Sequence, residues 1–216
     1  MTFARVGLLA LCAWLAIAAQ AVLAQPPGEW FKIPMPPKRD MAPNTMMEPI
    51  SREAKKRAFQ SMMMANPLSL RDMINLMVDK KQAKEGLSFD DVVESMKLRA
   101  NYHNFKLVGH SPLWKDVVAI TGVKDTPRVE IFSFCDAVVG RKILDYSPEF
   151  IAFLPCRIAV LEDSARRIWL VTLDWDVTWL DTSAHPDRIG EDLRKDAIRI
   201  REVMEDIMVA AARGDL

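Results

Sequence analysis

The sequence predicts an α+β fold, in which a mostly antiparallel sheet of about five strands packs helices on one face. Three observations support this prediction. Short β-rich runs and helical patterns follow one another in the order strand, helix, strand, strand, helix, strand, strand, helix. Only a short polar turn separates the last two strands, which predicts an antiparallel hairpin. The final helical pattern is long and amphipathic, as expected of a helix that packs on a sheet.

The domain is expected to open with a strand and a capped helix. Residues 73–81 are predicted as a strand, with a helical turn as the alternative. Ser88 begins a capping box in which Asp91 takes the position usually held by Glu. The helix that starts there is expected to stop near Asn101.

The middle of the chain contains the clearest strand. Residues 105–108 are predicted as a short strand that Gly109 closes. Residues 111–123 are interpreted as a loop with an apolar patch. Residues 129–134 are rich in β-branched and aromatic side chains and predict a strand more strongly than any earlier segment.

The last third of the domain alternates helices with a hairpin. Asp136 can cap a helix that runs through Leu144, and Ser147-Pro148 can start a short helical turn because proline is favoured at the first helical position. Residues 158–161 and 168–175 predict the hairpin. A last helix follows, and its apolar side is formed by Leu193, Ala197, Ile200, Met204, Ile207, Met208 and Ala211.

The first 24 residues have the features of a secretory signal. Arg5 supplies a positive charge, residues 6–23 form an uncharged apolar run, and small residues precede a cleavage site after Ala24. An uncleaved anchor is the alternative, although 18 residues are short of the about 20 that span a bilayer. We therefore expect an exported protein, periplasmic in a bacterium, that contacts the membrane only through an uncleaved signal.

An N-terminal extension, residues 25–66, precedes the domain. Seven prolines between residues 25 and 49 predict an extended linker or a strap over the surface. Ser51 can cap a short helix to about Met64, which would pack on the domain, on a partner or on a membrane surface. The α+β domain is then expected to occupy residues 67–216.

The charge balance argues against nucleic acid as a partner. The chain has 29 basic and 29 acidic residues, and loss of Arg5 with the signal leaves 28 against 29, a formal charge of −1. Proteins that bind nucleic acid carry a basic surplus. The sequence contains no nucleotide-binding loop and no nucleophile elbow, so no cofactor is predicted.

Two cysteines would remain in the exported chain, Cys135 and Cys156, each at the edge of a predicted strand. Cys135 precedes a helix N-terminus, which favours a thiolate, whereas the neighbouring Asp136 opposes it. Arg157 favours a thiolate at Cys156. A CxxC motif is absent, so thioredoxin-like chemistry loses its main support. Three interpretations stay open: two separately buried thiols, a structural disulfide, or a functional pair.

A histidine offers one further ligand. His110 follows a predicted strand and, if it converged with the two cysteines, could form a copper or zinc site. A loop histidine bonded to backbone or water is the alternative. The candidate ligand-binding residues are therefore Cys135, Cys156, His110, Asp136 and Arg157. The sequence predicts no catalytic residue and does not identify a metal.

An acidic and aromatic segment offers a different site. Trp175 and Trp179 could line a ligand groove near Asp174 and Asp176. They could equally cover the sheet or form a dimer face, because aromatic side chains are enriched at interfaces.

Several ordered segments resemble the family called domain of unknown function 302. Members show a strand that ends in a Cys-Asn-Pro-like turn; residues 134–137 here read Phe-Cys-Asp-Ala, with Asp and Ala in place of Asn-Pro. Residues 154–157, Leu-Pro-Cys-Arg, match a second strand start, and residues 86–91 match the lead into the first helix. The resemblance covers roughly residues 70–212. It implies a small α+β fold, often dimeric, with no settled activity, and it transfers only the positions of the two cysteines.

These observations predict an exported binding or carrier module for a thiophilic ligand, a sulfur species or a soft metal, with Cys135 and Cys156 in the site. One alternative is a thiol-based redox or sulfur-transfer enzyme. Another is a structural or interaction protein with inert, buried cysteines. The sequence does not decide between an enzyme and a binding protein, and it leaves a homodimer as an expected partner.

Overall fold

The computed structural model describes residues 42–66, 68–174 and 189–215. The described residues fall into two compact units, one containing residues 49–66 and the other residues 42–48 with everything from residue 68 onward. The predicted signal and most of the proline-rich stretch lie outside the described residues. Within these described ranges, no helix combines the length and the apolar character that a membrane span requires.

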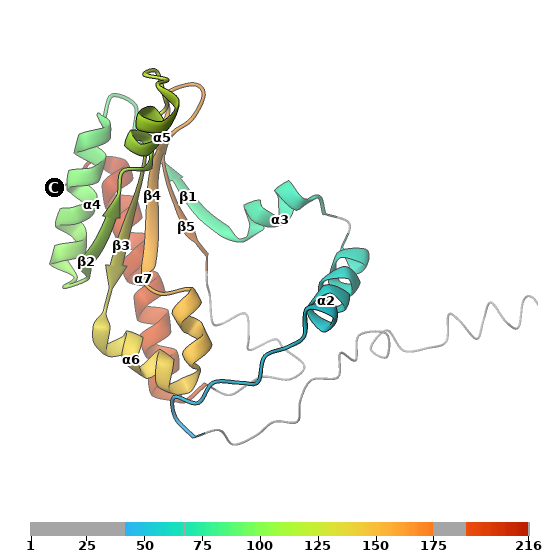
Figure 1. Ribbon diagram of the computed structural model, residues 1–216. Helices are drawn as coiled ribbons and strands as arrows, with labels where there is room; N and C mark the ends of the chain where they lie inside the picture. The colour runs from blue at the N-terminus through green and yellow to red at the C-terminus, as the bar shows by residue number, and fades with distance from the viewer. Residues whose placement is uncertain (1–41, 67, 175–188, 216) are drawn as a thin grey trace, which may run out of the picture. The chain divides into compact units, whose positions relative to one another are not determined.

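The larger unit is built on a five-stranded sheet in the order β1-β5-β4-β3-β2 (Figure 1). Every neighbouring pair is antiparallel, which confirms the predicted sheet. The strands are β1 (Val78–Gln82), β2 (Lys106–Ser111), β3 (Val129–Cys135), β4 (Cys156–Glu162) and β5 (Ile168–Leu173).

Helices in the described residues account for the rest of the regular structure. They are α2 (Arg52–Ala65), α3 (Leu70–Leu76), α4 (Phe89–Tyr102), α5 (Leu113–Thr121), α6 (Ala137–Tyr146), the short 3-10 helix η1 (Pro148–Ala152) and α7 (Glu191–Arg213). The smaller unit contains α2, which Ser51 caps as predicted. In the larger unit, α4 and α7 pack against each other on one face of the sheet (Figure 1). The α+β fold class is therefore confirmed.

The core lies between that face of the sheet and the two helices. Along β3 every second residue is buried, because side chains alternate across a strand. The face that carries Phe132 and Phe134 meets α4 and α7, and its fully buried neighbours include Val92, Met96, Ile158, Val160, Leu170, Ile207 and Met208. Ile131 lies on the opposite face and is only half-buried.

The predicted first strand is partly wrong. Its N-terminal half is α3, and the strand begins only at Val78. The cause is a second capping box, in which the Ser69 hydroxyl accepts from the Asp72 N–H and the Asp72 carboxylate accepts from the Ser69 N–H, each at 3.2 Å. That reciprocal pair starts a helix where the apolar residues alone suggested a strand.

Two predictions around residue 110 are also wrong. Gly109 does not close β2, which continues to Ser111 through a bulge between Leu107 and Gly109. A Cβ on Gly109 would lie 3.4 Å from the Cβ of Ser133, so glycine permits the close strand approach there. The expected loop at 111–123 is the helix α5, which follows Pro112 and ends at Gly122.

Gly122 shows why α5 stops where it does. Its φ of 73° lies in the left-handed region, and its N–H bonds to the carbonyl of Val118. A glycine in this conformation is a common helix C-terminus, because other residues pay a steric cost there. The apolar patch that the sequence placed in a loop therefore lies along a capped helix.

Part of the extension binds the larger unit. The Asn44 N–H donates to the Asp145 carbonyl at 2.8 Å, and the Met47 N–H donates to Glu149 Oε1 at 2.6 Å. These bonds hold residues 42–48 against the end of α6 and the start of η1. For the rest of the proline-rich stretch, linker and strap both stay predictions.

Three polar side chains join α4 to α7, and their contacts make the stability of the domain depend on pH. Arg99 Nε and His103 Nε2 lie 2.6 and 2.7 Å from Asp206 Oδ2. The bonds from Arg99 and then His103 lower the pKa of Asp206 below its ordinary 3.8, against an opposing effect of burial. Because the unfolded chain keeps the ordinary pKa, this stabilisation is complete above about pH 5 and disappears as the pH falls through the folded-state pKa.

We therefore expect Asp206→Asn to lower the urea midpoint at pH 6, and the difference from wild type to shrink toward pH 2. Urea titrations followed by circular dichroism at several pH values measure this difference. A difference that stays constant over the whole range would show that the Asp206 charge does not contribute.

Candidate functional site

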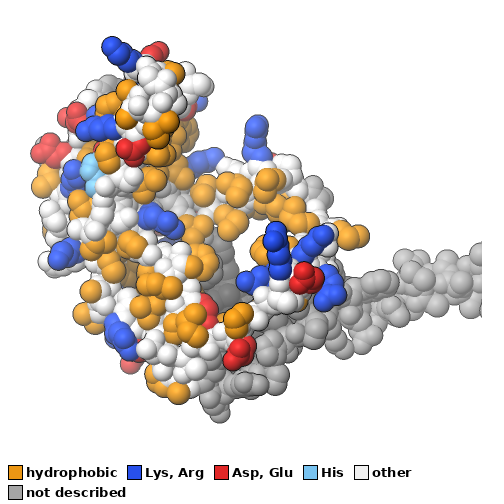
Figure 2. All heavy atoms as spheres, in the orientation of Figure 1, with side chains coloured by type: hydrophobic (Ala, Val, Ile, Leu, Met, Phe, Trp, Pro, Cys, Tyr) orange, Lys and Arg blue, Asp and Glu red, His pale blue; other side chains and the backbone are white. Residues whose placement is uncertain are grey.

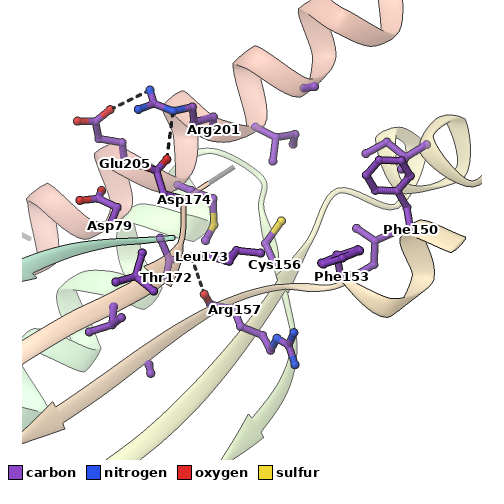
Figure 3. A pocket seen from close by; sticks show the side chains of 18 of the residues that line it. Asp79, Phe150, Phe153, Cys156, Arg157, Thr172, Leu173, Asp174, Arg201 and Glu205 are labelled. Carbon is purple, nitrogen blue, oxygen red and sulfur yellow. Dashed lines mark hydrogen bonds and ion pairs between the residues drawn. The ribbon is translucent and has the colours of Figure 1, made fainter. Parts of the chain in front are cut away.

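A cleft of about 470 Å³ lies at one end of the sheet (Figure 3). Its described walls come from the start of β1 and β4, the middle of β3, the end of β5, α6, η1 and α7 as far as Glu205. Most of the lining is apolar: Val78, Ile131, Ile143, Tyr146, Phe150, Phe153, Leu154, Cys156, Ala159, Val171, Leu173, Ile189, Leu193, Ala197, Ile200 and Met204.

Helix α7 forms one wall because its apolar stripe is longer than the core that it covers. Ile207 and Met208, in its second half, are fully buried beneath the sheet. Leu193, Ala197 and Ile200, in its first half, are only half-buried and face the cleft. The sequence predicted this stripe correctly. The helix therefore stabilises the domain mainly with its second half and lines the cleft mainly with its first half.

Polar groups gather on one side of this cleft. Arg201 on α7 lies 3.7 Å from the Asp174 carboxylate and 3.5 Å from that of Glu205. Asp79, at the start of β1, lies 3.2 Å from the Lys81 ammonium. In Figure 3 the Arg201 side chain extends from α7 toward Asp174 at the end of β5. The cleft thus pairs an extensive apolar wall with one charged rim.

Cys156 and Arg157 begin β4 and point to opposite sides of the strand (Figure 3). The Cys156 sulfur is on the side of Arg201 and Asp174 and packs against the core. Arg157 is exposed on the other side, and its carbonyl accepts from the Thr172 hydroxyl at 2.7 Å. Both residues line the cleft, so the structure brings Cys156 and Arg157 to one place, and their role in binding stays a prediction.

The two cysteines lie close to each other without forming a disulfide. β3 and β4 are neighbours, and Phe134 is paired with Cys156, so Cys135 is one residue further along the adjacent strand. Both cysteines are free and line a second, small cavity of about 20 Å³. The position that a Cβ would take on Gly140 of α6 is 3.7 Å from Cys135 Sγ, so glycine leaves room for that thiol.

The surroundings keep both thiols protonated. Burial, and then the negative charge of Asp136, raise the pKa of Cys135. Burial raises the pKa of Cys156 from 9.0 to about 11, Cys135 adds to this shift, and the Arg157 charge opposes it only weakly. The helix N-terminus and Arg157, which the sequence suggested as thiolate stabilisers, are outweighed by desolvation. At neutral pH the sulfurs are therefore neutral groups.

His110 is not brought to the cysteines. Its ring stacks on Phe132 with centroids 4.4 Å apart, and its Nε2 lies 2.7 Å from Glu130 Oε2. Across residues 42–66, 68–174 and 189–215, no three His, Cys, Asp or Glu side chains are grouped so that they could hold a metal ion. The soft-metal site suggested for His110, Cys135 and Cys156 therefore lacks the necessary geometry.

Asp136 has a structural position. Its carboxylate accepts from the N–H groups of Val138 and Val139 at 3.1 Å each, which caps α6 as predicted. Its second oxygen pairs with Arg199 of α7 at 2.8 Å. The Arg199 hydrogen bond is the largest cause that lowers the pKa of Asp136. Asp136 borders the small cavity, but its oxygens are already used by α6 and α7.

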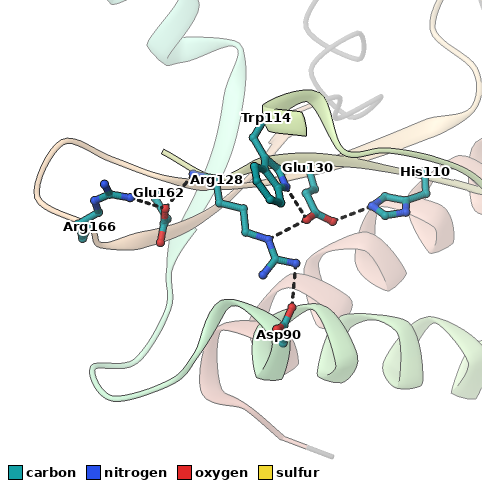
Figure 4. A network of polar contacts seen from close by, with 7 residues as sticks. All are labelled: Asp90, His110, Trp114, Arg128, Glu130, Glu162 and Arg166. Carbon is teal, nitrogen blue, oxygen red and sulfur yellow. Dashed lines mark hydrogen bonds and ion pairs between the residues drawn. The ribbon is translucent and has the colours of Figure 1, made fainter. Parts of the chain in front are cut away.

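A buried carboxylate, Glu130, was missed by the sequence reasoning (Figure 4). It accepts from Arg128 Nε at 2.7 Å and from Trp114 Nε1 at 3.1 Å, and it contacts His110. Burial raises its pKa, but these hydrogen bonds outweigh burial and leave the pKa below its ordinary 4.5. The sequence does contain a signal for its burial. Glu130 is two residues before Phe132 in a predicted strand, and side chains at that spacing lie on the same face of a sheet.

Glu130, Arg128, Trp114 and His110 form a network, which we call the Glu130 network, and it extends beyond the sheet. Arg128 also reaches Asp90 in the first turn of α4 at 2.8 Å, and its guanidinium lies 4.0 Å from the centre of the Phe89 ring. Glu130 therefore links β2, β3, α4 and α5 through three side chains. Because its partners saturate both oxygens, we assign it a structural role.

The acidic and aromatic segment is only partly described. Asp174 is in the rim of the cleft, whereas Trp175, Asp176 and Trp179 lie outside the described residues. Their proposed roles in a groove, a cover or a dimer face stay predictions.

Comparisons with known proteins place this fold and site in context. A family model described as "Domain of unknown function DUF302" matches residues 80–210. An uncharacterised protein from Aquifex aeolicus (strain VF5) is 34% identical over 82 residues, which is 38% of this chain. This match spans only 50% of the length of that curated relative.

A solved structure supports the fold. The crystal structure of an uncharacterised conserved DUF302 protein from Bacillus stearothermophilus superposes with a TM-score of 0.50 and 11% sequence identity. The match covers 63% of this chain and 98% of that one. At this identity the likeness concerns the fold alone. Because the family model covers more than half of the sequence, the chain belongs to the DUF302 family.

Proposed function

We propose that this protein is a binding or carrier module for a small, mainly apolar molecule with one polar end, held in the cleft at the end of the sheet. The observation that carries the proposal is the lining, in which apolar side chains predominate and charged groups gather on one rim. Ligand sites have this composition, because apolar walls supply affinity and a few polar groups fix orientation. The volume of about 470 Å³ falls in the range of such sites.

The rim favours a particular polar end. Its charged members are the carboxylates of Asp79, Asp174 and Glu205 and the guanidinium group of Arg201, whereas Arg157 lines the cleft from the other side of β4. Arg201 already lies between two of the carboxylates. A ligand end that donates hydrogen bonds or carries a positive charge therefore complements the rim better than an anion does.

The cysteines enter this proposal as parts of the wall. Cys156 would contact the ligand as a neutral sulfur, which suits a polarizable, weakly thiophilic or apolar molecule. The raised pKa values of both thiols favour passive contact over the alternative of a redox or sulfur-transfer enzyme, which needs a stabilised thiolate. Export to the periplasm and assembly as a homodimer belong to the same proposal and rest on the sequence.

The cleft can be tested by filling it. Ala197 lies on the cleft side of α7, and Ala197→Phe adds a ring to the binding space without changing a buried core position. We expect the affinity for the neutral fluorescent probe N-phenyl-1-naphthylamine to fall by about tenfold or more. Fluorescence titration of the full chain measures this affinity, and a thermal melt checks that the variant is folded.

Ala119→Phe provides the matched control. Ala119 is exposed on α5 and does not line the cleft, so the same substitution there should leave probe affinity unchanged. A competition experiment tests which polar end the cleft prefers. Because the rim favours a cation, dodecylammonium should displace the probe at a lower concentration than dodecanoate. Absence of probe binding by wild type, or equal binding by wild type and Ala197→Phe, would exclude this cleft as the site.

A further inference from the structure

Helix α2, in the smaller unit, has a surface that the proposed carrier function does not use. Its basic residues are Arg52, Lys55, Lys56 and Arg57, and its acidic residue is Glu53, so the four positive charges and one negative charge leave a net charge of +3. The basic residues occupy the first half of the helix. The second half ends in three consecutive methionines.

The two sides of α2 differ in exposure. Ala54, Ala58 and Ser61 recur at helical spacing and are half-buried. The other side is a stripe of basic residues followed by apolar ones. Since residues three and four apart share a helix face, this stripe consists of Arg52, Lys55, Lys56, Phe59, Met62 and Met63, which we call the α2 stripe.

The apolar end of the α2 stripe is largely exposed. Phe59 is 65% exposed and Met62 is 59% exposed. Figure 2 shows Lys and Arg side chains gathered on α2, with hydrophobic side chains beside them. Large apolar side chains at this exposure, next to clustered positive charge, are typical of a surface that contacts something else.

We propose that the α2 stripe docks on a bilayer surface that contains anionic phospholipids. Arg52, Lys55 and Lys56 would attract the phosphate groups, and Phe59 and Met62 would enter the boundary between headgroups and acyl chains. Charge complementarity selects this partner, because a neutral bilayer gives the basic half of the stripe nothing to bind. The predicted export signal at residues 1–24 is consistent with a chain that meets a bilayer.

The start of the helix is fixed locally, so the stripe does not depend on the membrane to form. The Ser51 hydroxyl accepts from the Ala54 N–H at 3.2 Å. This cap satisfies one of the free N–H groups of the first turn. The stripe is therefore presented by a helix that exists before docking.

Hydrogen exchange of the full chain tests the docking. The chain is mixed with phosphatidylcholine vesicles, or with vesicles in which one third of the lipid is phosphatidylglycerol, and exchange of the amides in residues 52–65 is followed by mass spectrometry. The neutral vesicles are the reference, because the apolar N-terminal run would bring the chain to both. We expect exchange in α2 to be about fivefold slower with the anionic vesicles and this protection to weaken in high salt.

Two sets of variants separate the contribution of charge to docking from that of apolar contact. Lys55→Glu with Lys56→Glu, and separately Phe59→Ser, should each abolish the anionic-lipid protection, whereas Lys55→Arg with Lys56→Arg should keep it. Lys115→Glu, on the exposed side of α5, is the control and should change nothing.

Two results would overturn the proposal. They are equal exchange in both kinds of vesicle and protection that survives the charge reversal. Neither of them bears on the cleft, whose test uses a soluble probe.

Discussion

Replacing Glu130 with alanine is expected to lower the free energy of unfolding by about 3 kcal/mol. The Glu130 side chain is 4% exposed and bonds to Arg128, and the substitution leaves that partly buried guanidinium with the exposed Asp90 as its remaining carboxylate partner. His110 and Trp114 lose their acceptor as well. The loss of three bonds to one buried charge is more costly than the removal of a surface ion pair, which contributes at most about 1 kcal/mol. Urea denaturation followed by tryptophan fluorescence and circular dichroism measures the change.

Glu94→Ala is the matched control for this experiment. Glu94 is exposed on α4, and its loss should change stability by less than about 0.5 kcal/mol. A double-mutant cycle of Glu130→Ala with His110→Ala should show coupling, because the two side chains are in contact. If Glu130→Ala were as stable as Glu94→Ala, the network would have no structural role.

The stabilisation that the Glu130 network provides should also depend on pH, and the direction of this dependence follows from the pKa of Glu130. Its folded-state pKa lies below the ordinary 4.5, so the stabilisation is fully present above the unfolded-state pKa and is lost as the pH falls through the folded-state pKa. The deficit of Glu130→Ala relative to wild type should therefore narrow in acid. From about pH 6 upward the titration of Glu130 should no longer change this deficit.

Cys156 is expected to react with iodoacetamide about 100-fold more slowly at pH 8 than an unperturbed cysteine, because only the thiolate is nucleophilic. Burial raises its pKa from 9.0 to about 11, and two units lower the thiolate fraction at this pH by about that factor. The rate should rise about tenfold per pH unit until the pH approaches about 11. Mass spectrometry of the peptide that contains Cys156, taken from alkylated Cys135→Ser, follows this thiol separately from Cys12.

The control is the same variant in guanidinium chloride, where Cys156 should react at the rate of an ordinary thiol. Cys156→Ser reports on Cys135, whose pKa is also raised. A rate that levels off below pH 8 for either cysteine would contradict the neutral-thiol assignment and favour the thiol-enzyme alternative. Two slow thiols, together with probe binding in the cleft, would instead support the carrier role.

A protein can bind a ligand in the cleft and still have unreactive cysteines. The probe titration and the alkylation rates, taken together, therefore separate the three functions that the sequence left open. A redox or sulfur-transfer enzyme requires one thiolate near neutral pH. A purely structural protein predicts slow thiols and no binding of the neutral probe. The proposed carrier predicts slow thiols and a probe affinity that Ala197→Phe reduces.

The elements that sequence reasoning placed correctly are those with local signals. Ser88 and Asp136 bond to N–H groups two or three residues away, so the starts of α4 and α6 depend on few residues. The hairpin of β4 and β5 also has a local signal, since Asp163 accepts from the N–H groups of Ala165 and Arg167 within the turn. The family resemblance, the antiparallel sheet and the stripe on α7 were likewise predicted.

The errors occurred where a local pattern fits two structures. The residues before Val78 suit either a strand or a short helix, and the capping box at Ser69 decides for the helix. Gly109 looks like the end of a strand, but a bulge and the close approach of Ser133 keep it within β2. In both places the deciding contact involves geometry that composition does not specify.

The sequence by itself determined the fold class, the family and the apolar sides of the strands and helices, because these follow from periodicity and from short-range caps. Only the tertiary structure decided what those sides face. The stripe of α7 is continuous in sequence, yet Ile207 is sealed in the core while Ala197 and Ile200 face the cleft. Likewise the spacing of Cys135 and Cys156 did not reveal their protonation. Burial by groups distant in sequence raises their pKa values, and such groups meet only when the chain folds.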